Sequence, residues 1–181
     1  MLYPMILCLG VLSAEADPTP NERLEQATRE LEAAKTPKER FYALNDVAKQ
    51  SLIAGKIGDA RFYAGELLAL LPHFPENWNY GNAVQDAHLV LGRIAVREKR
   101  ISDAKRHLYA SGKSGGSPQL NTFGPNMSLA KDLLEKGERQ AVLDHFERCR
   151  IFWKMDQGEL DKWSREVQEG KTPDFGVNLV D

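Results

Sequence analysis

A glycine in the middle of an apolar stretch most constrains how this chain can fold. Gly92 follows Leu91 within residues 85–112, QDAHLVLGRIAVREKRISDAKRHLYASG. Glycine costs about 1 kcal/mol relative to alanine inside a helix, so a helix keeps one where a neighbouring backbone must approach closely. Ala104 comes twelve positions after Gly92, and Leu108 comes four positions after Ala104. The stretch predicts two helices folded back on each other, with Ala104 as the small residue facing Gly92.

The same spacing occurs twice more in the chain. Upstream, Ala48 and Ala60 are twelve positions apart, and Pro72 follows after twelve more. Downstream, Ala130 and Val142 are also twelve positions apart. Three copies in one frame predict a repeated helical hairpin over residues 38–154.

These positions resemble the tetratricopeptide repeat (TPR), in which a large residue and Leu-Gly precede a second half containing Ala, Phe and Pro. In the central copy the pattern falls on His88, Leu91, Gly92, Ala95, Ala104 and Leu108. The family's aromatic residues are missing there, and Lys99 stands where a turn glycine is usual. The resemblance implies an all-α fold, an α-solenoid of about three TPR-like helical hairpins.

Two capping boxes predict helix starts near the N-terminal end of this array. Thr19 and Thr36 each precede a proline and stand three residues before a glutamate, the pattern that satisfies free amides in a first helical turn. The first of these helices is expected over residues 21–34, with an apolar stripe on one face. We interpret it as a cap on the first repeat.

A capping helix is also expected at the other end. Residues 159–169 carry Leu160, Trp163 and Val167 at helical spacing. Such a helix covers the open end of a stacked array. No segment alternates between apolar and polar residues over a strand length, so the chain is expected to be all-α, with about eight helices.

The first 16 residues have the composition of a secretory signal peptide. They are uncharged as far as Ser13, and Ala14-Glu15-Ala16 fits the small-x-small cleavage pattern, although no Lys or Arg precedes the apolar run. The prediction is an exported protein, periplasmic or secreted, whose residues 17–181 form a single TPR-like domain. If the segment is not a signal peptide, the protein is expected to be cytoplasmic.

Cleavage would leave Cys149 as the only cysteine, which excludes a disulfide within the mature chain. We expect Cys149 in the core, with a reactive thiol or an intermolecular bridge as the alternatives.

Charge and motifs favour a binding protein over an enzyme. A net charge of -2 argues against generic binding to nucleic acid or to an anionic membrane, and the apolar N-terminal run is too short for a membrane span. The four histidines are scattered, and neither a nucleophile elbow nor a dinucleotide fingerprint occurs. We therefore expect no catalytic residues, no metal site and no cofactor.

The TPR resemblance implies which residues line a concave groove for a protein or peptide partner. Nine of these positions form the candidate binding site: Tyr42, Asn45, Lys49, Asp86, Leu89, Arg93, Arg97, Met127 and Lys131. Four of them are cations on one predicted wall, which favours an acidic segment or a C-terminal carboxylate. The alternative for these cations is a solvated charged face.

Two other functions stay open. The loops at residues 73–82 and 113–126 are rich in Asn, Gly and aromatic residues, so they can close over a small-molecule pocket in a sensor or an unrecognised enzyme. Trp78 and Tyr80 in the first loop either pack under it or project into a groove. Self-association through the open ends of the array is the third hypothesis.

Overall fold

The computed structural model describes residues 17–179, and within this range the chain is helical and contains no β-strand. The expected signal peptide, residues 1–16, lies outside the described residues. The all-α prediction is confirmed for the part described. The elements are α1 (Pro20–Ala33), α2 (Pro37–Ile53), α3 (Ile57–Leu70), η1 (Leu71–His73), α4 (Tyr80–Arg97), α5 (Ile101–Ser111), α6 (Pro118–Phe123), α7 (Ser128–Leu134), α8 (Arg139–Phe152), α9 (Glu159–Gln168) and η2 (Gly176–Asn178).

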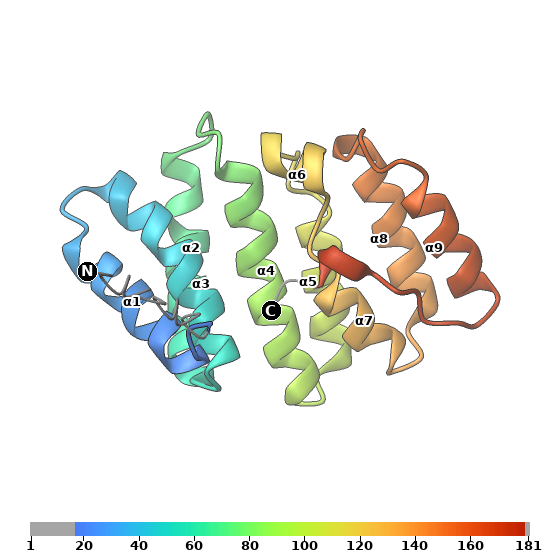
Figure 1. Cartoon of the computed structure of the whole chain (residues 1–181), viewed down its shortest axis with the longest axis horizontal. Helices are drawn as coiled ribbons and strands as arrows, with labels where there is room; N and C mark the ends of the chain where they lie inside the picture. Colours follow the sequence, from blue (N-terminus) through green and yellow to red (C-terminus); the bar gives the residue numbers. More distant parts are fainter. Residues whose placement is uncertain (1–16, 180–181) are drawn as a thin grey trace, which may run out of the picture.

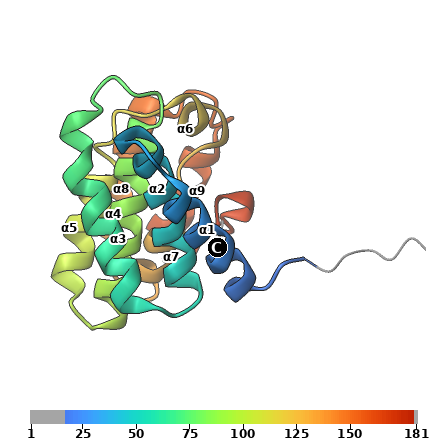
Figure 2. The ribbon, with the colours of Figure 1, turned by 90° about the vertical axis from the view of Figure 1, so that its left-hand side faces the viewer.

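The helices lie side by side in chain order from α1 to α9 (Figure 1). Each long helix packs against the next one along the chain, and α4 also contacts α2 and α7. Figure 2 shows α3 and α5 on one side of the molecule, with α1 and η2 on the other. The helix α4 is therefore the element around which the others are placed.

Local sequence rules fix the first two helix starts as expected. The hydroxyls of Thr19 and Thr36 accept hydrogen bonds from the backbone N–H groups of Glu22 and Glu39, and both capping boxes are complete. The expected helix at residues 159–169 is present as α9, with Leu160, Trp163 and Val167 buried. These three elements follow from patterns within one or two turns of chain.

The sequence did not predict α6, which lies inside the expected loop 113–126. Ser117 starts it, because its hydroxyl accepts a hydrogen bond from the Leu120 N–H at 3.0 Å, and Pro118 occupies the first turn. This Ser-Pro pair is the same start signal as the Thr-Pro pairs, but the glycines around it favoured a loop.

The core has two parts that meet at α4. One part holds apolar side chains of α1 to α4, including Phe41, Leu44 and Ile94. The other continues through α5 to α9 and ends in an aromatic group in which Trp163 packs against Phe175. Since α4 contributes side chains to both parts, it joins the two halves of the molecule.

Gly92 lets neighbouring helices approach α4 closely, but the residues that lie against it are not the expected Ala104. A Cβ at this position would lie 2.3 Å from Leu129 Cδ2 and 3.1 Å from His107 Cβ, which are closer than any atom of Ala104. Ala104 of α5 is fully buried, but it is not the residue that lies closest to Gly92. The glycine therefore makes room for α7 as well as for α5.

The chain between α9 and residue 179 folds back over the segment that precedes α7. Asn178 donates from Nδ2 to the carbonyl oxygens of Phe123 and Pro125, at 2.9 and 3.0 Å. Its own carbonyl accepts from the Met127 N–H at 2.7 Å. No helix within residues 17–179 has the length and apolar character that crossing a membrane requires.

Candidate functional site

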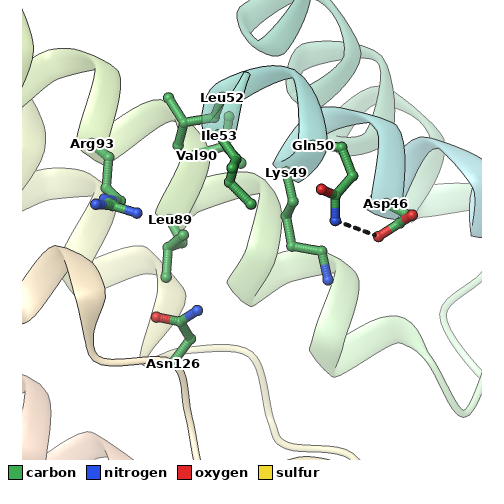
Figure 3. Close-up of a pocket in the computed structure, with 9 residues that line it drawn as sticks. All are labelled: Asp46, Lys49, Gln50, Leu52, Ile53, Leu89, Val90, Arg93 and Asn126. Atoms are coloured by element: carbon green, nitrogen blue, oxygen red, sulfur yellow. Dashed lines mark hydrogen bonds between the residues drawn. The ribbon is translucent and has the colours of Figure 1, made fainter. Parts of the chain in front are cut away.

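A polar cleft runs between α2 and α4 and reaches the segment before α7. It consists of two hollows, of about 190 and 320 Å³, that share Lys49 and Asn126 in their walls. The smaller one is shown in Figure 3, where side chains of α2 and α4 face Asn126. We call the two hollows together the α2–α4 cleft.

Lys49 and Asp86 form an ion pair across this cleft. Lys49 Nζ lies 3.1 Å from Asp86 Oδ2, with 33% of the lysine side chain and 14% of the aspartate side chain exposed. The negative charge of Asp86 raises the pKa of Lys49, and burial opposes that effect. The positive charge expected at Lys49 is thus compensated inside the protein.

Arg93 is compensated in the same way. Its Nε donates to Asp132 Oδ2 at 2.9 Å, and only 17% of its side chain is exposed. Asp132 comes from α7, so this ion pair joins α4 to α7. Lys49 and Arg93 both line the cleft, but each faces a carboxylate of a neighbouring helix.

Arg97 and Lys131 differ from these two. Arg97 donates from Nη1 to the Leu52 carbonyl oxygen at 3.4 Å, which places it at the C-terminal end of α2. Within residues 17–179, neither Arg97 nor Lys131 pairs with a carboxylate. Arg97 therefore contacts a residue that lines the smaller hollow, whereas neither Arg97 nor Lys131 lines the cleft itself.

Tyr42 and Asn45 are half-buried residues of α2. The Tyr42 hydroxyl accepts from Asn77 Nδ2 at 2.9 Å, and the Tyr42 ring lies 5.8 Å from that of Trp78. Trp78 is still 54% exposed, so it both packs against α2 and projects from its loop. Asn45 lines the larger hollow, and its Oδ1 is buried without a hydrogen-bond partner among the described residues.

The two apolar candidates have different positions. Leu89 is 5% exposed and lines the smaller hollow. Met127 is fully buried in the core beside α7. Met127 therefore cannot contact a partner directly, and its place in the expected groove is corrected to a core position.

Two amide side chains at the cleft, those of Gln85 and Asn178, were missed by the sequence reasoning. Gln85 is 2% exposed, and its Oε1 accepts from the Asn126 N–H at 3.3 Å, while its Nε2 has no partner among the described residues. Asn178 fixes the same segment from the other side. Gln85 could have been found from the sequence, because it is a polar residue at a core position of α4. The sequence around Asn178 holds no comparable signal.

The two loops expected to close a pocket do meet at the cleft. The Ser117 hydroxyl donates to Asn82 Oδ1 at 2.6 Å, and Asn82 Nδ2 donates to Gln119 Oε1 at 3.3 Å. Asn82 and Gln119 both line the larger hollow, together with the exposed ring of Phe123.

A buried thiol and imidazole lie in contact between α5 and α8. Cys149 Sγ lies 3.4 Å from His145 Nε2, and His145 Nδ1 donates to the Leu108 carbonyl oxygen at 3.1 Å. The imidazole nitrogen facing the sulfur therefore accepts from the thiol. Burial raises the pKa of Cys149 and lowers that of His145 to about 4. Both groups are neutral at pH 7, and Cys149 is a core residue as expected.

Clusters of three or more His, Cys, Asp or Glu side chains able to hold a metal do not occur between residues 17 and 179. The chain matches no protein-family model, and it shows no significant similarity to curated proteins or to solved structures. The functional argument therefore rests on the cleft.

Proposed function

We propose that this chain is a helical-repeat scaffold that holds an extended segment of a partner protein in the α2–α4 cleft. In this proposal α2–α3, α4–α5 and α7–α8 are three TPR-like hairpins of an α-solenoid, with α1 and α9 as caps. The observation that carries it is the cleft itself, lined by α2 and α4 and reaching the segment before α7. The contacts of α4 with both α2 and α7 support the assignment of these three as the first helices of successive repeats.

The cations of α4 and α7 that face no carboxylate among the described residues favour an acidic segment or a C-terminal carboxylate as the ligand. Guanidinium and ammonium groups bind carboxylates through charge-assisted hydrogen bonds. Because Lys49 and Arg93 already face Asp86 and Asp132, the preference rests on Arg97 and Lys131. Either residue can turn to a ligand without breaking an ion pair between helices.

The test is selection of displayed peptides with free C-termini on the full chain, followed by affinity measurement by fluorescence anisotropy. Arg97→Glu and Lys131→Glu each remove an uncompensated cation and should weaken binding about tenfold or more, the loss expected for one charged hydrogen bond. Lys38→Glu is the matched control, because Lys38 is exposed in the first turn of α2, whereas Arg97 contacts the last turn of that helix. Amidated peptides should bind less tightly if the carboxylate is recognised.

Selected peptides that bind the two charge-reversed variants as tightly as the original chain would exclude recognition of an acidic segment or a carboxylate by Arg97 and Lys131. Failure to select any peptide would count against a scaffold that binds extended segments.

The larger hollow favours a second candidate, a small-molecule sensor. Its volume of about 320 Å³ is at the lower end of the range for small-ligand sites. Its wall includes Gln85, whose Nε2 has no hydrogen-bond partner among the described residues. A thermal-shift screen with metabolites distinguishes the two, since a sensor should be stabilised by a compound and lose that response in Gln85→Leu.

A further inference from the structure

The larger hollow of the α2–α4 cleft is rich in carboxamide side chains. The chain has 15 asparagine and glutamine residues, and six of the thirteen residues that line this hollow are of these two types. They are Asn45 of α2, Asn82 and Gln85 of α4, Gln119 of α6, Asn126 before α7, and Asn178 of η2. Because they belong to five segments of the chain, their amide groups approach the hollow from several sides.

The lining of this hollow carries no net charge. Lys49 and Asp86 are the charged residues among those that line it, and they form an ion pair with each other. A charged ligand would lose its hydration here without gaining an uncompensated opposite charge. The lining therefore favours a ligand that is polar but neutral.

Two polar atoms of the lining residues have no hydrogen-bond partner between residues 17 and 179. One is a donor, Gln85 Nε2, and the other is an acceptor, Asn45 Oδ1. Gln85 is only 2% exposed, and a buried polar group without a partner destabilises a fold. A hydroxyl group both donates and accepts hydrogen bonds, so a ligand that carries hydroxyl groups can satisfy either atom when the side chain turns toward it.

Apolar side chains stand at the same hollow. Val177 and Phe123 are 86% and 71% exposed, the two highest values for large apolar side chains within residues 17–179, and both line the hollow. The backbone that presents Phe123 is fixed, because its carbonyl oxygen accepts from Asn178 Nδ2 at 2.9 Å. Gly124 follows with a φ of 83°, and a Cβ there would lie 2.5 Å from the Trp153 ring. Two exposed apolar side chains beside a polar hollow indicate a ligand that also has an apolar face.

We infer that the larger hollow binds a neutral saccharide, a monosaccharide or a disaccharide. A sugar ring carries hydroxyl groups around its edge and C–H groups on its faces. The hydroxyl groups match the carboxamides, since both donate and accept hydrogen bonds. The C–H groups pack against the negative face of the Phe123 ring. The inference rests on the second candidate function, because it names the class of small molecule that the sensor takes.

A nucleobase is the nearest alternative, because it is also neutral and stacks on aromatic rings. Its hydrogen-bonding groups all lie in the plane of its ring, whereas the hydroxyl groups of a sugar point away from the ring in several directions. Carboxamides that approach from five segments suit the second arrangement. Nucleosides are therefore the comparison class in the test.

The test is a thermal-shift titration of the full chain with three classes of compound in separate experiments. The saccharides are glucose, galactose, N-acetylglucosamine and maltose, the nucleosides are adenosine and cytidine, and the charged compounds are glutamate and lysine. We expect at least one saccharide to raise the melting temperature, and we expect no shift with the other two classes. Calorimetric titration then measures the affinity for that saccharide.

Two variants locate the saccharide. Phe123→Ala should weaken its binding about fivefold through loss of the ring contact, and Gln119→Ala should weaken it about threefold or more through loss of a hydrogen bond. Phe62→Ala and Gln168→Ala are the matched controls, because both residues are exposed, on α3 and α9, outside the hollow. All four substitutions change exposed side chains, so circular dichroism should show the same fold in each variant.

The outcomes separate this inference from the functions on which it could depend. A shift with a nucleoside or a charged compound, but with no saccharide, would overturn the inference and keep the sensor. No shift with any compound would overturn both. Equal saccharide affinity in the original chain and in the Phe123 and Gln119 variants would place the saccharide outside this hollow and overturn the assignment. Arg97→Glu and Lys131→Glu, which test peptide binding, should leave saccharide binding unchanged, since neither residue lines the hollow.

Discussion

Lys49 and Asp86 join α2 to α4 through an ion pair of 3.1 Å at the wall of the cleft. Both side chains are largely buried, and each comes from a helix that lines the cleft. The pair therefore has two effects. It holds the two helices at a fixed separation, and it removes one positive charge from the surface offered to a ligand.

A double-mutant cycle measures the first effect. Lys49→Met and Asp86→Asn should each destabilise the fold by about 1 to 3 kcal/mol, because each leaves a partly buried charge without its partner. The coupling energy from urea denaturation of the single and double variants should be about 1 kcal/mol. The control pair is Arg29 and Glu25 on α1, which is 69% and 71% exposed at 3.9 Å and should couple by less than about 0.5 kcal/mol. Equal coupling in the two cycles would mean that the Lys49 pair does not hold the helices.

Gly92 and Gly65 should respond oppositely to the same substitution. Gly92→Ala places a methyl group 2.3 Å from Leu129 Cδ2, and overpacking of this kind costs about 1 to 3 kcal/mol. Gly65 lies within α3, and a Cβ there meets nothing within 4 Å. Gly65→Ala should therefore stabilise the protein by up to about 1 kcal/mol through helix propensity alone. Thermal denaturation of both variants checks the sign, and stabilisation by Gly92→Ala would show that Leu129 gives way freely.

The sequence predicted correctly those structural features that depend on interactions between residues a few positions apart. The Thr19 and Thr36 caps and the apolar stripe of α9 are of this kind, and all three are present. A cap depends on one hydroxyl and one amide three residues away. Packing of the remaining chain does not change that relationship.

The sequence did not predict which side chains pair at the candidate site, because these pairs join residues that are far apart along the chain. The TPR resemblance placed Lys49 and Arg93 on one wall, but their partners Asp86 and Asp132 are 37 and 39 residues further along the chain. Helical periodicity gives the direction of a side chain and says nothing of what the next helix presents to it. Met127 was misplaced for the same reason, because its side chain packs in the core with residues of α5 to α9 that are distant in the sequence.

Asn178 should hold the segment before α7, residues 123–127, in its folded conformation. Its side chain donates to the carbonyl oxygens of Phe123 and Pro125, and its carbonyl accepts from the Met127 N–H. Asn178→Ala removes the two side-chain hydrogen bonds and leaves buried acceptors unpaired, at a cost of about 1 to 3 kcal/mol. Amide hydrogen exchange at Met127 should become faster, while exchange within α2 stays unchanged. Val177→Ala is the control, since Val177 is 86% exposed. Unchanged protection of Met127 in the Asn178 variant would show that the segment is held by other contacts.

Stability should fall as the pH is lowered from about 6.5 to 4, with His145 as one cause. Burial lowers the pKa of His145 from 6.5 to about 4 in the folded chain, so between these values the unfolded chain binds a proton that the folded chain does not. Unfolding is then favoured by acid, by about 2 to 3 kcal/mol over the whole window. His145→Gln loses hydrogen bonds and should be less stable at pH 7, but its stability should depend less steeply on pH.

Urea denaturation at pH 7.0, 6.0, 5.0 and 4.5 gives the slope, and the slope of the variant should correspond to about one proton fewer. His73→Gln is the matched control, because His73 is exposed in η1, outside the contact between α5 and α8. His88 keeps part of the slope in both variants, since its pKa is also lowered to about 4. Parallel pH profiles for the original chain and His145→Gln would mean that the imidazole between α5 and α8 becomes protonated without unfolding the protein.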